Sequence, residues 1–209
     1  MKNIILLYLL TLILTSCSGD GNLEIINRTK NEIYFSIENT DYILTGSNDP
    51  DTDPEAISIK LSAGKDFLNN PEKSYTLFIE GETFAIYDYV QHIVVPSTEI
   101  VIKSGEVTTV YCNPGYACVR LINNSLQDIS SAWYIKSTNS TPALISGSVN
   151  LAPTQSTYCR LDYMTDNPNG PEDYLYYIFQ VILRDSTLLE FGDETNYLFN
   201  DDLYQIIIE

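Results

Sequence analysis

The chain has 209 residues, of which 28 are acidic and 11 are basic, and its formal net charge is −17. A chain this acidic lacks the lysine and arginine that neutralise a phosphate backbone, so we expect no nucleic-acid partner. The same charge disfavours flat adsorption on anionic headgroups. A strongly negative chain can still bind divalent cations or a positively charged partner surface.

The first residues have the order of a secretory signal. Residues 1–3 carry one lysine, and an apolar run over 4–14 follows that is too short to span a membrane. Thr15 and Ser16 then stand directly before Cys17. This pattern resembles the lipobox of bacterial lipoproteins, which carry a type II signal peptide.

The resemblance implies that the sulfur of Cys17 receives a diacylglycerol, that the signal over 1–16 is removed, and that the new amino group is acylated, with palmitate for example. We therefore expect membrane attachment in the bacterial cell envelope, on the periplasmic or cell-surface side, with residues 17–22 as a lipidated tether. The alternative is an ordinary secretory signal in which Cys17 is incidental.

The rest of the sequence is dominated by β-strand patterns, with turn residues recurring about every ten residues. The predicted strands cover 23–29, 33–37, 56–61, 75–79, 83–89, 99–103, 107–111, 119–125, 129–135, 148–151, 156–161, 175–183, 187–191 and 203–208. Residues 99–103 and 107–111 are predicted to form a hairpin around Gly105. Residues 174–183 also fit a helical stripe, but their tyrosine, isoleucine, phenylalanine and valine content favours a buried strand.

The strand pattern restarts halfway along the chain. Residues 23–29 align with residues 119–125, since each is an apolar strand that ends in asparagine and a hydroxyl residue, which is how a strand closes into a turn. We therefore predict an all-β chain with two tandem antiparallel β-sandwich domains, over 23–112 and 117–209, separated at Asn113-Pro114-Gly115. A single larger sandwich is the alternative.

Residues 119–162 resemble a small bacterial extracytoplasmic β-sandwich module. The resemblance rests on Asn123-Asn124-Ser125, on Asp128-Ile129 at the next strand, and on Pro153 at a later strand entry. Thr154 replaces the glycine that usually follows this proline. Such modules are recurrent scaffolds of surface and periplasmic proteins, so the resemblance implies a fold and no particular activity.

Three cysteines follow the signal: Cys112, Cys118 and Cys159. Pro114-Gly115 favours a tight reversal between the first two, so a Cys112–Cys118 disulfide is predicted. A Cys118–Cys159 bridge, metal binding, and burial as small unpaired side chains are the alternatives.

Two acidic loops are candidates for calcium. Asp49, Asp51, Asp53 and Glu55 alternate in a predicted loop, and hard oxygen ligands at that spacing suit calcium. Two prolines stiffen this loop, and it lacks the glycine of an EF-hand. The second oxygen-rich loop contains Asp166, Asn167, Asn169, Glu172 and Asp173. A solvated acidic turn is the default, and no other cofactor is expected.

The sequence contains no nucleophile elbow, phosphate-binding loop or paired-thiol metal motif. His92, the single histidine, lies in an apolar run where a hydrogen-bonded structural role fits better than a triad. A carboxylate pair for glycoside hydrolysis needs an acid with a raised pKa, for which Asp88 between Tyr87 and Tyr89 is the candidate. We expect no enzymatic activity.

Together these patterns predict a lipid-anchored extracytoplasmic β-sandwich protein with a structural or binding role toward a protein or glycan partner. Tyrosine clusters such as Tyr174, Tyr176 and Tyr177 fit either a recognition surface or a sheet core. The alternatives are an envelope glycoside-acting enzyme with paired carboxylates and a calcium-stabilised adhesin-like module.

Overall fold

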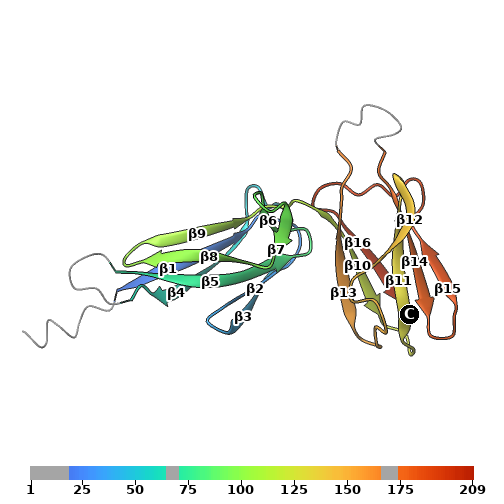
Figure 1. The fold of residues 1–209 in the computed structure, drawn as a ribbon, viewed down its shortest axis with the longest axis horizontal. Helices are drawn as coiled ribbons and strands as arrows, with labels where there is room; N and C mark the ends of the chain where they lie inside the picture. Colours follow the sequence, from blue (N-terminus) through green and yellow to red (C-terminus); the bar gives the residue numbers. More distant parts are fainter. Residues whose placement is uncertain (1–18, 65–70, 166–173) are drawn as a thin grey trace, which may run out of the picture. The chain divides into compact units, whose positions relative to one another are not determined.

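The computed structural model of the protein describes residues 19–64, 71–165 and 174–209 (Figure 1). Cys17 and the oxygen-rich loop that begins at Asp166 therefore lie outside the described residues. The described part of the chain forms 16 β-strands and no helix, which confirms the all-β prediction. It accordingly contains no helix long and apolar enough to cross a membrane.

The chain divides into two compact units. The first unit contains strands β1 to β9. The second contains strands β10 to β16 together with two short segments from earlier in the chain, Thr29–Asn31 and Gly81–Phe84. The sequence-based domain 23–112 includes both segments, and the domain limits themselves stay a prediction.

The strands of the first unit are β1 (Asp20–Asn27), β2 (Ile33–Ile37), β3 (Thr40–Leu44), β4 (Glu55–Ser62), β5 (Glu72–Gly81), β6 (Ile86–Asp88), β7 (Ile93–Val95), β8 (Ser97–Lys103) and β9 (Val107–Cys112). Those of the second unit are β10 (Ala117–Asn123), β11 (Ile129–Lys136), β12 (Asn139–Leu144), β13 (Ser156–Leu161), β14 (Tyr177–Leu183), β15 (Leu188–Phe191) and β16 (Leu203–Ile208).

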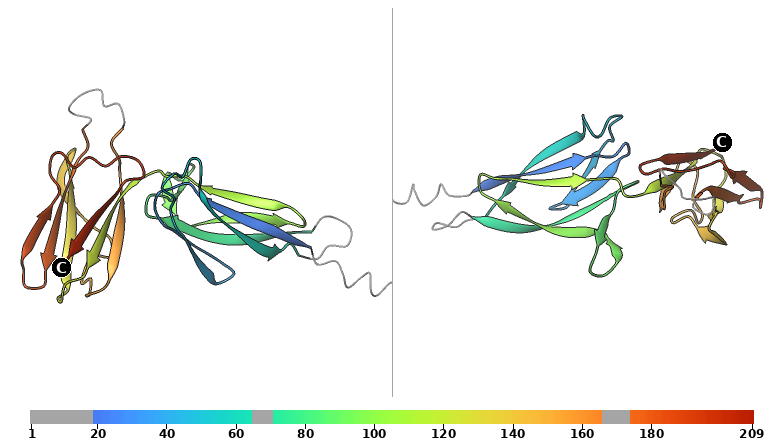
Figure 2. Two further views of the ribbon diagram at one scale, coloured as in Figure 1. Left: turned by 180° about the vertical axis from the view of Figure 1, so that it is seen from behind. Right: turned by 90° about the horizontal axis from the view of Figure 1, so that it is seen from above.

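Both units have the same sandwich topology, which agrees with the sequence repeat. The first unit has a three-stranded sheet of order β4-β1-β9 and a four-stranded sheet of order β3-β2-β5-β8. The second unit repeats this order as β13-β10-β16 and β12-β11-β14-β15. The first unit has one addition, the two-stranded sheet β6-β7, which the chain forms after β5 and before β8. Strands β6 and β7 are labelled in Figure 1, and Figure 2 gives two further views of the fold.

Two details of pairing differ from the prediction. Each three-stranded sheet contains one parallel pair, β1 with β9 and β10 with β16, so the sandwiches are not wholly antiparallel. The predicted hairpin of 99–103 with 107–111 is wrong, because β8 pairs with β5 whereas β9 pairs with β1. The turn at Gly105 therefore carries the chain from one sheet to the other.

Alternating apolar side chains build the core of each sandwich. In β5, Tyr75, Leu77 and Ile79 are buried while the residues between them are exposed. In β14, Tyr177 and Phe179 are almost fully buried in the core of the second unit. Burying each such side chain contributes about 1.5–3 kcal/mol, which fixes the register of the strand.

Buried asparagines close the first strand of both units in the same way. The amide of Asn27 donates to the carbonyls of Leu44 and Thr45, and that of Asn123 donates to the carbonyls of Gln127 and Leu151. Because a buried amide without partners is costly, the aligned asparagines of the sequence repeat have a structural reason to be there.

The strand predictions succeed where alternation is strong and fail at polar edges. Residues 174–183 contain a strand, as predicted, and not a helix. Strands β3 and β12 lie at sheet edges and are missing from the prediction; β12 carries mostly polar or small residues, and β3 begins with the polar pair Thr40 and Asp41. The strand predicted over residues 148–151 is wrong, because these residues form a turn that ends in an isolated bridge at Leu151.

Candidate binding surfaces and a buried polar network

Two hollows lie on the outer face of the sheet β3-β2-β5-β8 in the first unit. Their volumes are about 320 Å³ and about 420 Å³. Ser36 of β2 and Phe78 of β5 line both of them, so the two hollows are adjacent on this face. We call the pair the sheet groove.

Strand alternation turns the groove residues outward. Phe78 lies between the buried residues Leu77 and Ile79, so its ring points away from the core and is 51% exposed. Tyr34 of β2 stands directly opposite Ile43 of β3, which is 65% exposed. One end of the groove is therefore apolar and open to solvent.

The rest of the groove is lined by polar groups. Ser36 is paired with Asp41 across β2 and β3. At the far end, the ammonium group of Lys73 lies 3.4 Å from a carboxylate oxygen of Glu38 and 4.3 Å from the centre of the Tyr75 ring. Contact with Tyr75, and then with Glu38, raises the pKa of Lys73.

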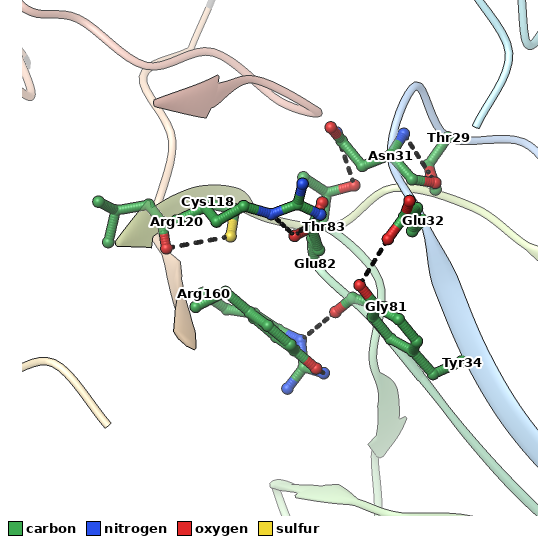
Figure 3. A network of polar contacts seen from close by, with 12 residues as sticks. Thr29, Asn31, Glu32, Tyr34, Gly81, Glu82, Thr83, Cys118, Arg120 and Arg160 are labelled. Carbon is green, nitrogen blue, oxygen red and sulfur yellow. Dashed lines mark hydrogen bonds and ion pairs between the residues drawn. The ribbon is translucent and has the colours of Figure 1, made fainter. Parts of the chain in front are cut away.

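The second unit contains a buried polar network around its segment Gly81–Phe84 (Figure 3). Glu82 is 1% exposed, and the guanidinium of Arg120 in β10 donates a 2.6 Å hydrogen bond from Nε to Oε1 of Glu82 and forms an ion pair with the same oxygen. Arg160 in β13 donates to the carbonyls of Gly81 and Phe84 at 2.8 Å and 3.0 Å. Two arginines of adjacent strands thus hold one short segment.

Asp201 is the second centre of this network. It is 5% exposed, and its carboxylate accepts hydrogen bonds from the Thr83 hydroxyl at 2.6 Å, the Asn31 amide at 3.1 Å and the Lys30 backbone at 2.7 Å. Its backbone has a φ of 72°, a conformation that costs energy in a residue other than glycine. The Asp201 carboxylate therefore holds the segments Thr29–Asn31 and Gly81–Phe84 in place, which is a structural role.

The predicted Cys112–Cys118 disulfide is absent from the structure, in which Cys112, Cys118 and Cys159 are all free thiols. Cys112 is fully buried at the end of β9 in the first unit, and Cys118 is buried in β10 of the second. A Cys118–Cys159 bridge is also absent. The residue opposite Cys159 is Val119, so Cys118 and Cys159 point to opposite faces of their sheet.

The calcium candidates of the first loop are not brought together. Asp49 closes a turn by accepting a 2.6 Å hydrogen bond from the Thr52 hydroxyl, and Glu55 begins β4 opposite Asn27. Among residues 19–64, 71–165 and 174–209, no group of three or more histidine, cysteine, aspartate or glutamate side chains is placed to hold a metal ion. Asp51 and Asp53 are exposed residues of the same turn.

His92 and Asp88 lie in the β6–β7 hairpin. His92 is exposed at the turn with a φ of 56°, so the prediction of a structural histidine within an apolar strand is wrong. The Asp88 carboxylate accepts hydrogen bonds from the backbone of Val90 and Gln91 at 2.8 Å and 3.0 Å, which makes it a turn-closing residue.

Hydrogen bonds lower the pKa of two carboxyl groups of the second unit. The backbone and then the hydroxyl of Thr187 lower the pKa of Asp185, and the hydroxyl and backbone of Thr195 lower that of Asp193. A general acid for glycoside hydrolysis needs a shift in the opposite direction. These two groups therefore close turns and are unsuited to acid catalysis.

The sequence does not identify the groove residues. Ile43 lies in a strand that the pattern does not predict, and the strand around Phe78 is predicted from its apolar content without regard to which residues face outward. A signal is present at Phe78, since Thr76, Phe78 and Glu80 share one face of β5. An aromatic residue on an otherwise polar face indicates a contact surface better than a core.

No protein-family model and no curated protein matches the sequence. Solved structures with some similarity include the Bacillus anthracis TIE protein, at 12% identity and a TM-score of 0.29, covering 91% of this chain and 34% of that one. The chain thus spans about a third of that protein's length.

Two further similar structures are a pilin and a fimbrial protein. The major pilin of Streptococcus pyogenes has 10% identity and a TM-score of 0.26, covering 91% of this chain and 97% of that one. The tip fimbrial protein Mfa3 of Porphyromonas gingivalis has 9% identity and a TM-score of 0.26, covering 83% and 81%. TM-scores this low establish no shared function.

Proposed function

We propose that the protein is a lipid-anchored, extracytoplasmic β-sandwich protein of the bacterial envelope that binds a carbohydrate in its sheet groove. The single observation that carries the binding role is the pair of adjacent hollows that share Ser36 and Phe78. Volumes of about 320 Å³ and 420 Å³ fall in the size range of small-ligand sites.

The chemistry of the groove supports a neutral sugar. Phe78 and Tyr34 offer aromatic rings for the apolar faces of sugar rings, and Ser36, Asp41 and Thr76 offer groups for hydroxyls. The net charge of −17 disfavours anionic polymers by repulsion. A neutral polyol with alternating apolar and polar surfaces is therefore the ligand class that fits best.

The sequence supports the location. Lipid attachment at Cys17 would tether β1, which begins at Asp20, within a few residues of the membrane. A protein held in this way keeps its groove in the extracytoplasmic space, where envelope and environmental glycans are found. Structural support and binding are compatible roles for such a protein.

Titration with a panel of neutral oligosaccharides, followed by NMR, tests the groove. Phe78→Ala should weaken binding about tenfold, since stacking contributes about 0.5–1.5 kcal/mol beyond area burial. Val101→Ala is the matched control, because Val101 is 41% exposed on β8 of the same sheet and does not line either hollow. Equal affinities for the two variants, or no binding by the wild type at millimolar sugar, would contradict the proposal.

A further inference from the structure

The β6–β7 hairpin is an addition that the sandwich fold does not need. In the second unit, strands β14 and β15, which correspond to β5 and β8, are joined directly by the turn at Asp185 and Ser186. The corresponding connection, from β5 to β8, runs through Gly81–Phe84 and then through the hairpin Ile86–Val95 of the first unit. The hairpin therefore calls for a reason other than folding.

The hairpin exposes large apolar side chains. Tyr89 and Val90 at its tip are 81% and 90% exposed, and Tyr87, Ile93 and Val94 in its strands are 38–47% exposed. Clustered exposed apolar residues of this kind mark contact surfaces, whereas isolated ones are ordinary.

The shape of the hairpin is held before any partner arrives. The Asp88 carboxylate fixes the turn through two backbone amides, and the rings of Tyr87 and Tyr89 meet edge to face at 5.1 Å. A preformed surface loses less conformational entropy on binding.

The edges of this small sheet are open. Among the described residues, β6 pairs only with β7, so each strand has one edge without a neighbour. Natural edge strands are usually protected by lysine or proline, and residues 85–95 contain no lysine, arginine or proline. A two-stranded sheet is marginal alone and gains stability from a third strand.

The position and the charge of the protein narrow the choice of partner. Within the first unit, the backbone carbonyl of Asp20 accepts a hydrogen bond from Gly105, two residues after Lys103, which pairs with the first residue of β5. Asp20 therefore lies at the end of the sandwich where β5 begins. The hairpin follows the opposite end of β5. The hairpin thus lies at the end away from the tether, which argues against a lipid surface. Two copies with a charge of −17 each repel one another, which argues against self-association.

We propose that the β6–β7 hairpin docks an extended segment of another protein, which adds as a third strand to this sheet. The segment would present apolar side chains at alternate positions to Tyr87 or Val94, with lysine or arginine at its flanks to complement the acidic chain. This proposal concerns a surface separate from the sheet groove and does not depend on sugar binding.

A displayed library of random dodecapeptides, selected against the mature chain, tests the proposal. Enriched peptides should be basic and should alternate apolar residues. Synthetic copies should bind Tyr87→Ser/Val94→Ser about tenfold or more weakly than the wild type, a change of about 1.4 kcal/mol. The control Val101→Ser/Val107→Ser alters two valines of the first unit that are 41% and 58% exposed outside the hairpin, and it should bind normally.

A second arm alters the peptide and leaves the hairpin unaltered. Peptides methylated on the backbone amides that face the sheet should lose binding, because strand addition requires those donors. Phe78→Ala should bind the peptides normally, which separates this site from the groove. The proposal is overturned if no basic alternating peptide is enriched, if the hairpin variant or the methylated peptides bind as well as their parents, or if phosphatidylglycerol vesicles bind the hairpin in place of peptides.

Discussion

Cys112 shows how burial sets the chemistry of a single side chain. It is fully buried at the end of β9, and burial raises the pKa of its thiol from 9.0 to about 12. Burial also raises the pKa of Cys118, and the negative charge of Glu82 raises it further. The pKa of Tyr177 is raised mainly by burial as well. In the folded protein these groups stay neutral well above the pH at which they ionise when unfolded.

Stability should therefore fall at alkaline pH. Below pH 9 the Cys112 thiol keeps its proton in both states, and between pH 9 and about 12 the unfolded chain alone releases it, so the free energy of unfolding falls by about 1 kcal/mol per pH unit. Urea denaturation at pH 8 and pH 10 measures the fall. Cys112→Ala should show a shallower dependence on pH, and an unchanged slope in that variant would contradict the assignment.

At the scale of elements, the segment Gly81–Phe84 depends on the Glu82–Arg120 ion pair. Arg120→Met should lower the free energy of unfolding by about 3 kcal/mol, because it leaves a buried carboxylate without its guanidinium. Glu82→Gln/Arg120→Met should cost less than the sum of the two single changes, since the charge is then gone as well. Urea denaturation of the four proteins forms the cycle, and additive costs would show that the pair is not coupled.

Elements with strong alternation could be predicted from the sequence, and their pairing could not. Strands β2, β13 and β16 lie where the sequence predicts them, and in β2 every second side chain is buried in the core. Local sequence around Gly105 reads as a hairpin, although β8 and β9 belong to different sheets. A turn within a sheet and a turn between sheets use the same residues, so only long-range pairing distinguishes them.

The candidate sites follow the same rule. Acidic runs such as that around Asp49 resemble metal sites in sequence, yet the Asp49 carboxylate closes a turn in the structure. The sheet groove depends on which residues of β2, β3 and β5 become neighbours, which no linear pattern states. Asp201 and Asn31 are more than a hundred residues apart, and their contact could be seen only after folding.

At the scale of the whole molecule, both units share one sandwich topology, and the first unit adds a hairpin to it. The aligned asparagines Asn27 and Asn123 close corresponding strands, and the hairpin β6–β7 distinguishes the first unit from the second. The first unit also carries the sheet groove. Both proposed binding surfaces, the sheet groove and the hairpin, therefore lie in the first unit.

Whether this protein works at a membrane depends on Cys17, and intact mass spectrometry of the protein extracted from envelopes measures it most directly. We predict a mature chain that begins at Cys17 and carries the mass of a diacylglycerol and a further acyl chain, while Cys17→Ser yields an unacylated protein that leaves the envelope fraction. A wild-type chain that begins elsewhere or lacks acyl mass, or a Cys17→Ser protein that is still processed and still sediments with envelopes, would contradict the account.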